Sequence, residues 1–135
     1  SEPNIKFTLL KKQSSNIIYA DEEQLNRVFI NLIKNSVESI HEKINKSANF
    51  KGKINIDIRD DSAYIYVTII DNGVGFDHVD KAKMLTPYYT TKTKGTGLGL
   101  AIVNKIINDH NSSIIFSSID EGAKTKITIP KNHEQ

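Results

Sequence analysis

The sequence contains no cysteine, one methionine, three prolines and no long hydrophobic run. The absence of cysteine excludes disulfide frameworks, zinc knuckles and thiol nucleophiles. No apolar run approaches the ~18 residues of a membrane span, and the first residues are too polar for a signal peptide. The 18 Lys and Arg residues nearly balance the 16 Asp and Glu residues, to a net charge of +2, without a basic cluster. We therefore expect a cytoplasmic domain with no nucleic-acid partner and no direct membrane contact.

The remaining composition is that of an ordinary globular domain. The chain has 135 residues, of which 38% are hydrophobic and 25% are charged. Single domains usually run to roughly 100–200 residues, so we expect one domain over residues 1–135. Because the first residue is Ser and not Met, we expect this domain to be cut from a longer protein.

Two segments have the periodicity of amphipathic helices. The first starts at the capping sequence 21–24, and its apolar residues follow in steps of three and four: Leu25, Val28, Phe29, Leu32, Ile33, Val37, Ile40 and Ile44. The second is predicted from about Leu98 to Asp109. It should end at His110-Asn111, because Asn tolerates the left-handed conformation that terminates helices.

Short β-rich segments predict strands between and around the two helices. Their ranges are 5–10, 17–20, 53–59, 63–70, 113–118 and 124–130. A turn sequence at 60–62 predicts an antiparallel hairpin, and Gly122 predicts a turn between the last two strands. The order ββαββ–loop–αββ indicates an α+β fold, with helices layered on one face of a mixed sheet.

A long segment without periodicity, residues 71–99, holds five of the seven glycines. The sequence Gly95-Thr96-Gly97-Leu98-Gly99 leads directly into the second helix. A helix N-terminus offers free N–H groups, and glycines let the backbone approach an anion, so this segment suits a phosphate. Glycine content alone equally favours a flexible loop that ends in a helix cap, and no Walker sequence occurs.

Two further polar groups could carry chemistry. Asp71 ends a predicted strand and is followed by Asn72-Gly73, so its carboxylate could accept a hydrogen bond from an exocyclic amine; a plain turn is the alternative. Asn31, Asn35 and Glu38 share one side of the first helix. Amide oxygens on adjacent turns can bind Mg²⁺, although for one helix considered alone a solvated face is the favoured interpretation.

Together these segments resemble a known family. The sequences Asn31-x-x-x-Asn35-Ser36, Asp71-x-Gly73-x-Gly75-Phe76, Pro87–Lys92 and Gly95–Leu100 resemble the N, G1, F and G2 boxes of sensor histidine kinases. These boxes define the ATP-binding catalytic domain, in the superfamily that also includes gyrase B, Hsp90 and MutL. The similarity runs from about residue 17 to residue 130 and is greatest to the nitrogen-regulation kinases NtrY and NtrB.

The resemblance implies a two-layer α/β sandwich of the Bergerat type, with a mobile ATP lid over residues 77–96. It implies that Asp71 binds the adenine amino group, that Asn35 coordinates Mg²⁺ on the phosphates with Asn31 in support, and that Lys92 reaches the phosphates. Asn31, Asn35 and Lys92 would be the catalytic residues. The full set of implied ATP-binding residues is Asn31, Asn35, Asp71, Gly73, Gly75, Lys92, Gly95, Thr96, Gly97, Leu98, Gly99, Leu100 and Thr125.

The sequence departs from the family pattern at three positions. Many histidine kinases have a basic and an aromatic residue shortly after the second Asn of the N box, where this chain has Glu38 and Ser39. The final Gly-x-Gly-Thr element is present as residues 122–125, with Lys124 in place of the second Gly. A contact of a basic residue with phosphate and an aromatic stack on adenine are therefore not expected from positions 38 and 39.

The residue at position 31 favours a kinase over an ATPase. Hydrolases of the superfamily have a Glu there as general base, whereas the amide of Asn31 cannot take a proton from water. None of the four histidines (41, 78, 110 and 133) has the setting of a phosphoacceptor. The resemblance thus implies that the domain binds Mg·ATP and donates the γ-phosphate to a histidine on a separate dimerisation domain, for relay to a response regulator. The isolated chain should not phosphorylate itself.

Three alternatives stay open at this point. An ATP-gated interaction module would bind nucleotide without transferring phosphate, and an ATPase of the gyrase type would hydrolyse it. A serine kinase acting on a separate protein is the third. The lid sequences 87–92 and 95–100 argue against the latter two.

Overall fold

A computed structural model of the chain describes residues 5–12, 22–75 and 99–131. Its elements are β1 (Ile5–Lys12), α1 (Glu22–Lys46), β2 (Gly52–Asp60), β3 (Tyr64–Asp71), α2 (Gly99–Asp109), β4 (Ser113–Ile119) and β5 (Gly122–Pro130). The strand predicted at 17–20, the capping residue Asp21 and the lid at 77–96 lie outside the described residues.

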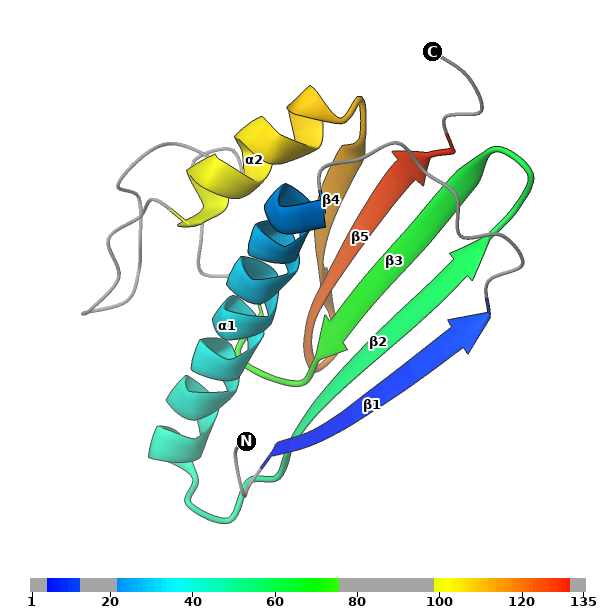
Figure 1. Ribbon diagram of the computed structural model, residues 1–135. Coiled ribbons are helices and arrows are strands. Elements are labelled where there is room, and N and C mark those ends of the chain that lie inside the picture. The colour runs from blue at the N-terminus through cyan, green and yellow to red at the C-terminus, as the bar shows by residue number, and fades with distance from the viewer. Residues whose placement is uncertain (1–4, 13–21, 76–98, 132–135) are drawn as a thin grey trace.

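The five strands form one mixed sheet in the order β1-β2-β3-β5-β4. β1 runs parallel to β2, and the other neighbours are antiparallel. Both helices cover the same face of this sheet, as Figure 1 shows. The predicted α+β class, the two-layer arrangement and the hairpin over residues 53–70 are therefore confirmed.

Several element boundaries differ from the prediction, by one or two residues in β2 to β5. β1 continues to Lys12 because Lys11 and Lys12 pair with Ile58 and Arg59 of β2, a long-range contact that local turn chemistry does not reveal. α1 continues to Lys46, beyond Ile44, the last residue of its predicted apolar stripe. α2 ends as expected: Asn111 has φ 54°, and the Ser112 N–H closes the last turn on Ile107 O at 3.0 Å.

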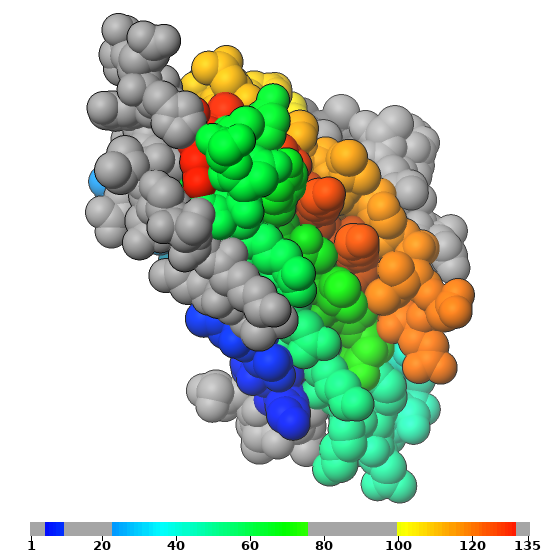
Figure 2. Space-filling model, turned by 90° about the vertical axis from the view of Figure 1, so that its right-hand side faces the viewer, coloured from blue at the N-terminus to red at the C-terminus, as the bar shows by residue number. Residues whose placement is uncertain are grey.

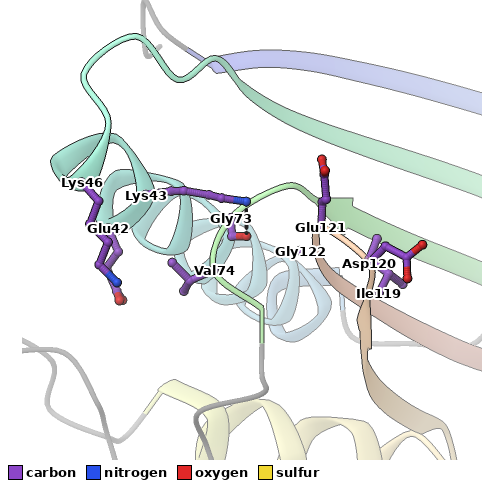
Figure 3. A pocket seen from close by; sticks show the side chains of 9 residues that line it. All are labelled: Glu42, Lys43, Lys46, Gly73, Val74, Ile119, Asp120, Glu121 and Gly122. Atoms are coloured by element: carbon purple, nitrogen blue, oxygen red, sulfur yellow. Dashed lines mark hydrogen bonds between the residues drawn. The ribbon is translucent and has the colours of Figure 1, made fainter.

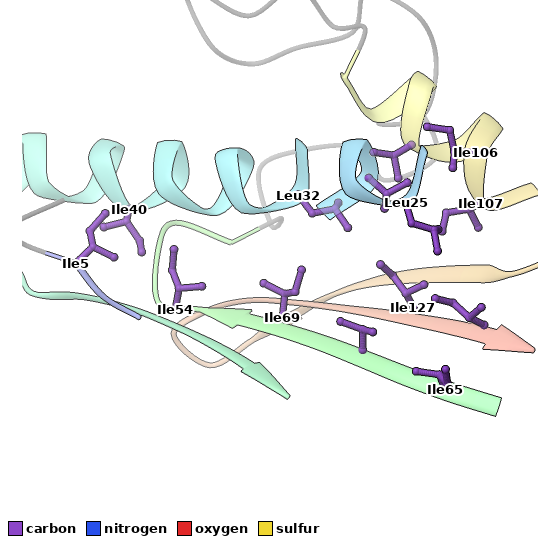
Figure 4. Packing of buried hydrophobic residues seen from close by; sticks show 14 residues of the cluster. Ile5, Leu25, Leu32, Ile40, Ile54, Ile65, Ile69, Ile106, Ile107 and Ile127 are labelled. Atoms are coloured by element: carbon purple, nitrogen blue, oxygen red, sulfur yellow. The ribbon is translucent and has the colours of Figure 1, made fainter. Parts of the chain in front are cut away.

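The core lies between the helices and the sheet. Along β3 every second residue faces the helices and is buried, whereas the residues between them face outward. Figure 4 shows α1 and α2 packed over these strand side chains. The cluster consists of Ile5, Leu25, Val28, Leu32, Ile40, Ile54, Ile65, Val67, Ile69, Val103, Ile106, Ile107, Ile127 and Ile129. The apolar stripe predicted on the first helix thus supplies one wall of the core.

No helix of the described residues covers the other face of the sheet. Figure 2 shows the strands of the five-stranded sheet side by side on this face. On it, Arg59 pairs with Asp57 at 2.8 Å, and the Lys126 ammonium lies 5.1 Å from the centre of the Tyr66 ring. Among the described residues, no helix is long and apolar enough to cross a membrane.

A buried ion pair closes the end of the sheet where β3 begins. The Lys131 ammonium lies 2.5 Å from the Asp60 carboxylate, and the two side chains are only 4% and 3% exposed. The backbone N–H of Lys131 also donates to Ala63 O at 2.7 Å. These contacts tie the end of β5 to the β2–β3 turn, at the end of β3 that lies away from Asp71.

Candidate functional site

Asp71 is the last residue of β3 and lies on the face of the sheet that the helices cover. Its side chain is 5% exposed. One carboxylate oxygen, Oδ1, accepts the backbone N–H of Gly73 at 2.9 Å, and the Ser36 hydroxyl from α1 supplies a second hydrogen bond. Burial raises the pKa of Asp71, while the Gly73 N–H, Ser36 and the positive charge of Lys43 partly offset this effect. The site thus contains a buried carboxylate held mainly by neutral donors.

The segment after Asp71, residues 71–75, is here called the Asp71 loop. A polar line on α1 holds one side of it. Ser39 Oγ accepts the backbone N–H of Val74 at 2.9 Å. Lys43 Nζ donates to the carbonyl oxygens of Asn72, at 3.3 Å, and Gly73, at 3.4 Å. Three helical side chains, those of Ser36, Ser39 and Lys43, therefore contact successive groups of the loop.

The start of β2 holds the loop from a second side. The Asn72 side chain accepts the backbone N–H of Lys53 at 2.8 Å and donates to Lys51 O at 3.1 Å. The backbone N–H of Asn72 also donates to Lys53 O at 3.3 Å. Asn72 thus extends the β2–β3 pairing by one residue and fixes where the Asp71 loop leaves the sheet.

Glycines allow the loop to approach its neighbours closely. A Cβ at Gly73 would lie 2.3 Å from Ser39 Oγ and 2.7 Å from the Ser39 backbone carbon, so a larger residue would push the loop away from α1. At Gly122, the first residue of β5 after the β4–β5 turn, φ is +131° and a Cβ would lie 1.9 Å from Asp71 O. Gly75 has φ +78°, in the left-handed region that favours glycine. The loop is therefore packed between α1 and the β4–β5 turn.

A pocket of about 410 Å³ opens beside this packed loop. Figure 3 shows it between the C-terminal half of α1 and the β4–β5 turn, with the Lys43 side chain reaching across to Gly73. Its lining combines lysines, carboxylates and two apolar side chains: Glu42, Lys43, Lys46, Gly73, Val74, Ile119, Asp120, Glu121 and Gly122. Of the predicted ligand-binding residues that the structure describes, Gly73 alone is in this lining.

The structure describes both asparagines of α1 that were predicted to bind Mg·ATP. Asn31 is half-buried, and its side-chain N–H donates to Arg27 O at 2.9 Å. Asn35 and Glu38 are also half-buried, and Asn35 directly precedes Ser36, which contacts Asp71. Within the described part of the chain, no group of three or more His, Asp or Glu side chains could hold a metal alone.

The other predicted residues divide into two groups. Thr125 is buried on β5, opposite Ile69 of β3, and so lies on the same face of the sheet as Asp71. Gly99 begins α2, and Leu100 is half-buried against the core. Lys92, Gly95, Thr96, Gly97 and Leu98 lie outside the described residues.

Three residues that shape the site were assigned no role from the sequence. Ser36 and Ser39 contact the Asp71 carboxylate and the Val74 N–H, and Lys43 contacts two loop carbonyls. Their spacing of three and four places them on one side of a helix, and this polar line was the available signal. The departure from an aromatic residue at position 39 also has a structural counterpart, because Ser39 is a hydrogen-bond partner of the loop.

The match to a family model decides the affiliation of the chain. Residues 20–133 match the model described as "Histidine kinase-, DNA gyrase B-, and HSP90-like ATPase". The chain belongs to this family. Sporulation kinase B of Bacillus subtilis is 38% identical over 115 residues, which are 84% of this chain and 25% of that protein. NtrB of Azospirillum brasilense, a sensory histidine kinase/phosphatase, is 31% identical over 134 residues, 94% of this chain and 34% of that protein.

Solved structures give the same result. The catalytic domain of histidine kinase ThkA superposes with a TM-score of 0.78 and 32% identity, over 95% of this chain and 80% of that domain. ThkA in complex with response regulator TrrA matches with a TM-score of 0.73 and 26% identity, over 96% of this chain and 35% of that chain. The predicted resemblance to the catalytic domains of sensor histidine kinases is confirmed, although the chain spans only a quarter to a third of the two kinases compared above.

Proposed function

We propose that this domain binds Mg·ATP beside Asp71 and donates the γ-phosphate to a histidine of a dimerisation domain in a two-component sensor kinase. The adenine lies against Asp71 with Gly73 and Gly75 as its floor, and Thr125 supports this end of the site. The triphosphate extends towards Asn35 and the start of α2. The phosphates are bound by Lys92 and the segment 95–100.

The observation that carries this proposal is the state of Asp71. An ionised carboxylate offers about four acceptor positions. Two protein donors, the Gly73 N–H and the Ser36 hydroxyl, bind the carboxylate, so acceptor capacity remains for an exocyclic amine. Because the group is 5% exposed, a hydrogen bond to a ligand here is formed away from competing water. This is the chemistry that recognition of the adenine amino group requires.

Asn35 fits a role in holding Mg²⁺. The ion prefers oxygen ligands, keeps several waters and is usually held by one or two protein side chains together with substrate phosphates. The single amide oxygen of Asn35, in the residue before Ser36, agrees with that donor set. When bound, the ion would neutralise charge on the phosphates.

The environment of Asn31 supports transfer over hydrolysis. One N–H of its side chain donates to Arg27 O, which fixes the amide, and its oxygen is an acceptor that a ligand could use. That oxygen can accept a hydrogen bond and orient a water or phosphate, but an amide cannot act as general base. Phosphoryl transfer depends mainly on positioning and charge neutralisation, which such a site can provide.

The partners follow from the same proposal. The acceptor histidine lies on a dimerisation domain of the parent kinase, and the phosphoryl group then passes to a response regulator. The complex of ThkA with a response regulator supports the second partner, and the identity with sporulation kinase B and NtrB supports membership of a sensor kinase. His41 and His110, the two histidines in the described part of the chain, lie within α1 and just after α2 and are not proposed as acceptors.

Calorimetric titration with Mg·ATP tests the proposed site. Asp71→Asn removes the charged acceptor, and Asn35→Ala removes the metal ligand. A lost hydrogen bond to a charged group corresponds to an affinity loss of roughly 10- to 100-fold. Asp57→Asn, on the outer face of the sheet, is the matched control and should bind like the wild type. Unchanged affinity in both site variants would refute the assignment.

Two assays separate the proposed activity from its alternatives. The isolated domain should show no steady hydrolysis of ATP, whereas sustained turnover would favour an ATPase. In the full-length parent, γ-labelled ATP should label a histidine outside this domain. Binding of ATP without any such label would favour an ATP-gated interaction module.

A further inference from the structure

We infer that Lys43 is a positioning residue of the nucleotide site, whose ammonium group holds the backbone of the Asp71 loop in the orientation in which Asp71 recognises the base. This inference rests on the proposed function and extends it to a residue that contacts neither the base nor the phosphates.

The contacts of Lys43 join two peptide units of the loop. Its Nζ donates to Asn72 O and Gly73 O at 3.3 and 3.4 Å. The N–H groups of the same two peptide units belong to Gly73 and Val74. These donate to Asp71 Oδ1 and to Ser39 Oγ, each at 2.9 Å. Each unit is therefore held at its carbonyl by Lys43 and at its N–H by a second side chain.

The planarity of the peptide bond links these contacts. A trans peptide unit is rigid, and its C=O and N–H point in opposite directions. When Lys43 fixes the Asn72 carbonyl, it also fixes the direction of the Gly73 N–H, which holds the Asp71 carboxylate. The orientation of the carboxylate thus depends on a lysine that lies 28 positions earlier in the chain.

The side chain of Lys43 is itself held in place. Its ammonium lies 4.9 Å from the centre of the Phe50 ring, so an aromatic face and two carbonyls surround the charge. Lys43 is half-buried, whereas Lys46, which lines the same pocket from the next turn of α1, is exposed. An ordered lysine loses more side-chain entropy than an exposed one, and these contacts offset that loss.

The charge of Lys43 acts on Asp71 in the same direction. Its positive charge lowers the pKa of Asp71 and partly offsets burial, which raises it. Removing the ammonium would both release the two carbonyls and raise the pKa of Asp71 further. The other groups that face the carboxylate are the neutral donors Gly73 N–H and Ser36.

Three variants test the inference. Lys43→Met keeps the alkyl chain near Phe50 but removes the ammonium, Lys43→Arg restores a positive donor, and Lys46→Met is the matched control. Amide hydrogen exchange of Gly73 and Val74 in the free protein reports loop order, and titration with Mg·ATP reports affinity. A charge-assisted hydrogen bond corresponds to an effect of about 10-fold on either quantity.

We expect Lys43→Met to speed exchange at both amides and to weaken ATP binding, each by about 10-fold, while exchange in the core strands stays unchanged. Lys43→Arg should recover most of both effects, and Lys46→Met should show neither. Unchanged exchange at Gly73 and Val74 in Lys43→Met overturns the inference. Faster exchange with unchanged ATP affinity also overturns it, because the loop would then move without consequence for binding.

A parallel titration of Asp71→Asn distinguishes failure of this inference from failure of the proposed function. Normal ATP affinity in Asp71→Asn would refute recognition of the base by Asp71, and the inference would fall with it. Loss of affinity in Asp71→Asn with normal exchange and affinity in Lys43→Met would refute the role of Lys43 alone.

Discussion

A buried carboxylate lies at each end of β3, and the two are held in different ways. Beside the start of β3, Asp60, the last residue of β2, has the ammonium of Lys131 at 2.5 Å, with both side chains nearly inaccessible. At the end of the strand, Asp71 is 5% exposed and is bound by a backbone N–H and a hydroxyl. The first carboxylate has its counter-charge within the protein, whereas the second keeps acceptor capacity for a ligand.

This difference separates a carboxylate that is paired within the fold from one that is a candidate to bind a ligand. Burying a charge is costly unless it is paired, and the Asp60–Lys131 pair meets that requirement inside the fold. The hydrogen bonds of Asp71 and the charge of Lys43 offset the cost of its burial only in part, so the pKa of Asp71 is raised. A group whose environment remains unfavourable until a ligand arrives is a candidate binding residue on physical grounds.

The largest predicted effect is a loss of folding stability at the end of β3 where Lys131 pairs with Asp60. Lys131→Met leaves Asp60 buried without its counter-charge, and such a loss costs about 3–5 kcal/mol of folding free energy. Thermal or denaturant unfolding should show this loss, while ATP affinity of the folded fraction should be unchanged. The double variant Lys131→Met/Asp60→Leu should recover much of the stability. Wild-type stability in Lys131→Met would show that the pair does not close this end.

A smaller effect, on both stability and ATP affinity, is expected at the Asp71 end of β3. Gly122→Ala places a Cβ against Asp71 O at a φ of +131°, which alone costs about 1–3 kcal/mol. Because the turn presses on the Asp71 loop, ATP affinity should fall together with stability. Gly52→Ala is the control for a clash away from this loop: its Cβ would lie 2.5 Å from Ile40 Cγ2, so stability should fall while the ATP affinity of the folded fraction stays unchanged. Equal ATP affinity in Gly122→Ala and the wild type would contradict this packing.

The smallest effect concerns the melting temperature, which removal of the Asp71 charge and removal of the Asp60 charge should change in opposite directions. The pKa of Asp71 is raised in the fold, so its carboxylate destabilises the folded state at neutral pH relative to a neutral group. Asp71→Asn should therefore raise the melting temperature near pH 7. The gain should shrink as pH falls through the raised folded-state pKa and vanish below the unfolded value of about 3.9.

Asp60→Asn should act in the opposite direction, because it leaves the buried Lys131 ammonium without its counter-charge. Melting temperatures of both variants across pH provide the measurement. A lower melting temperature of Asp71→Asn at neutral pH would show that the Gly73 N–H and Ser36 compensate for burial completely.

The sequence alone predicted the elements better than their contacts. Helical periodicity located α1, and the strand followed by Asn72-Gly73 identified Asp71 as a carboxylate at a buried strand end. Both signals are local. The parallel pairing of β1 with β2 and the contact of Lys43 with the Asp71 loop arise from packing between distant segments. Local propensity carries no information on such contacts, and the polar helix side predicted from the sequence was that of Asn31, Asn35 and Glu38.

The contact that Gly122 makes with Asp71 also could not be predicted from local sequence signals. Its turn was predicted from glycine and the flanking strands, but its contact with Asp71 O depends on the pairing of β3 with β5. The family resemblance supplied the roles of Asn35 and Asp71, which periodicity could not. The nucleotide roles of these residues, and of those outside the described ranges, stay predictions.

Backbone amide chemical shifts of the labelled domain, recorded during a titration with Mg·ATP, show whether the nucleotide binds beside Asp71. We expect large shifts for Ser36, Asp71, Gly73 and Val74, and none for Asp60, Ala63 and Lys131 at the other end of β3. Shifts that leave the Asp71 loop unchanged, or that concentrate around the Asp60–Lys131 pair, would contradict binding beside Asp71.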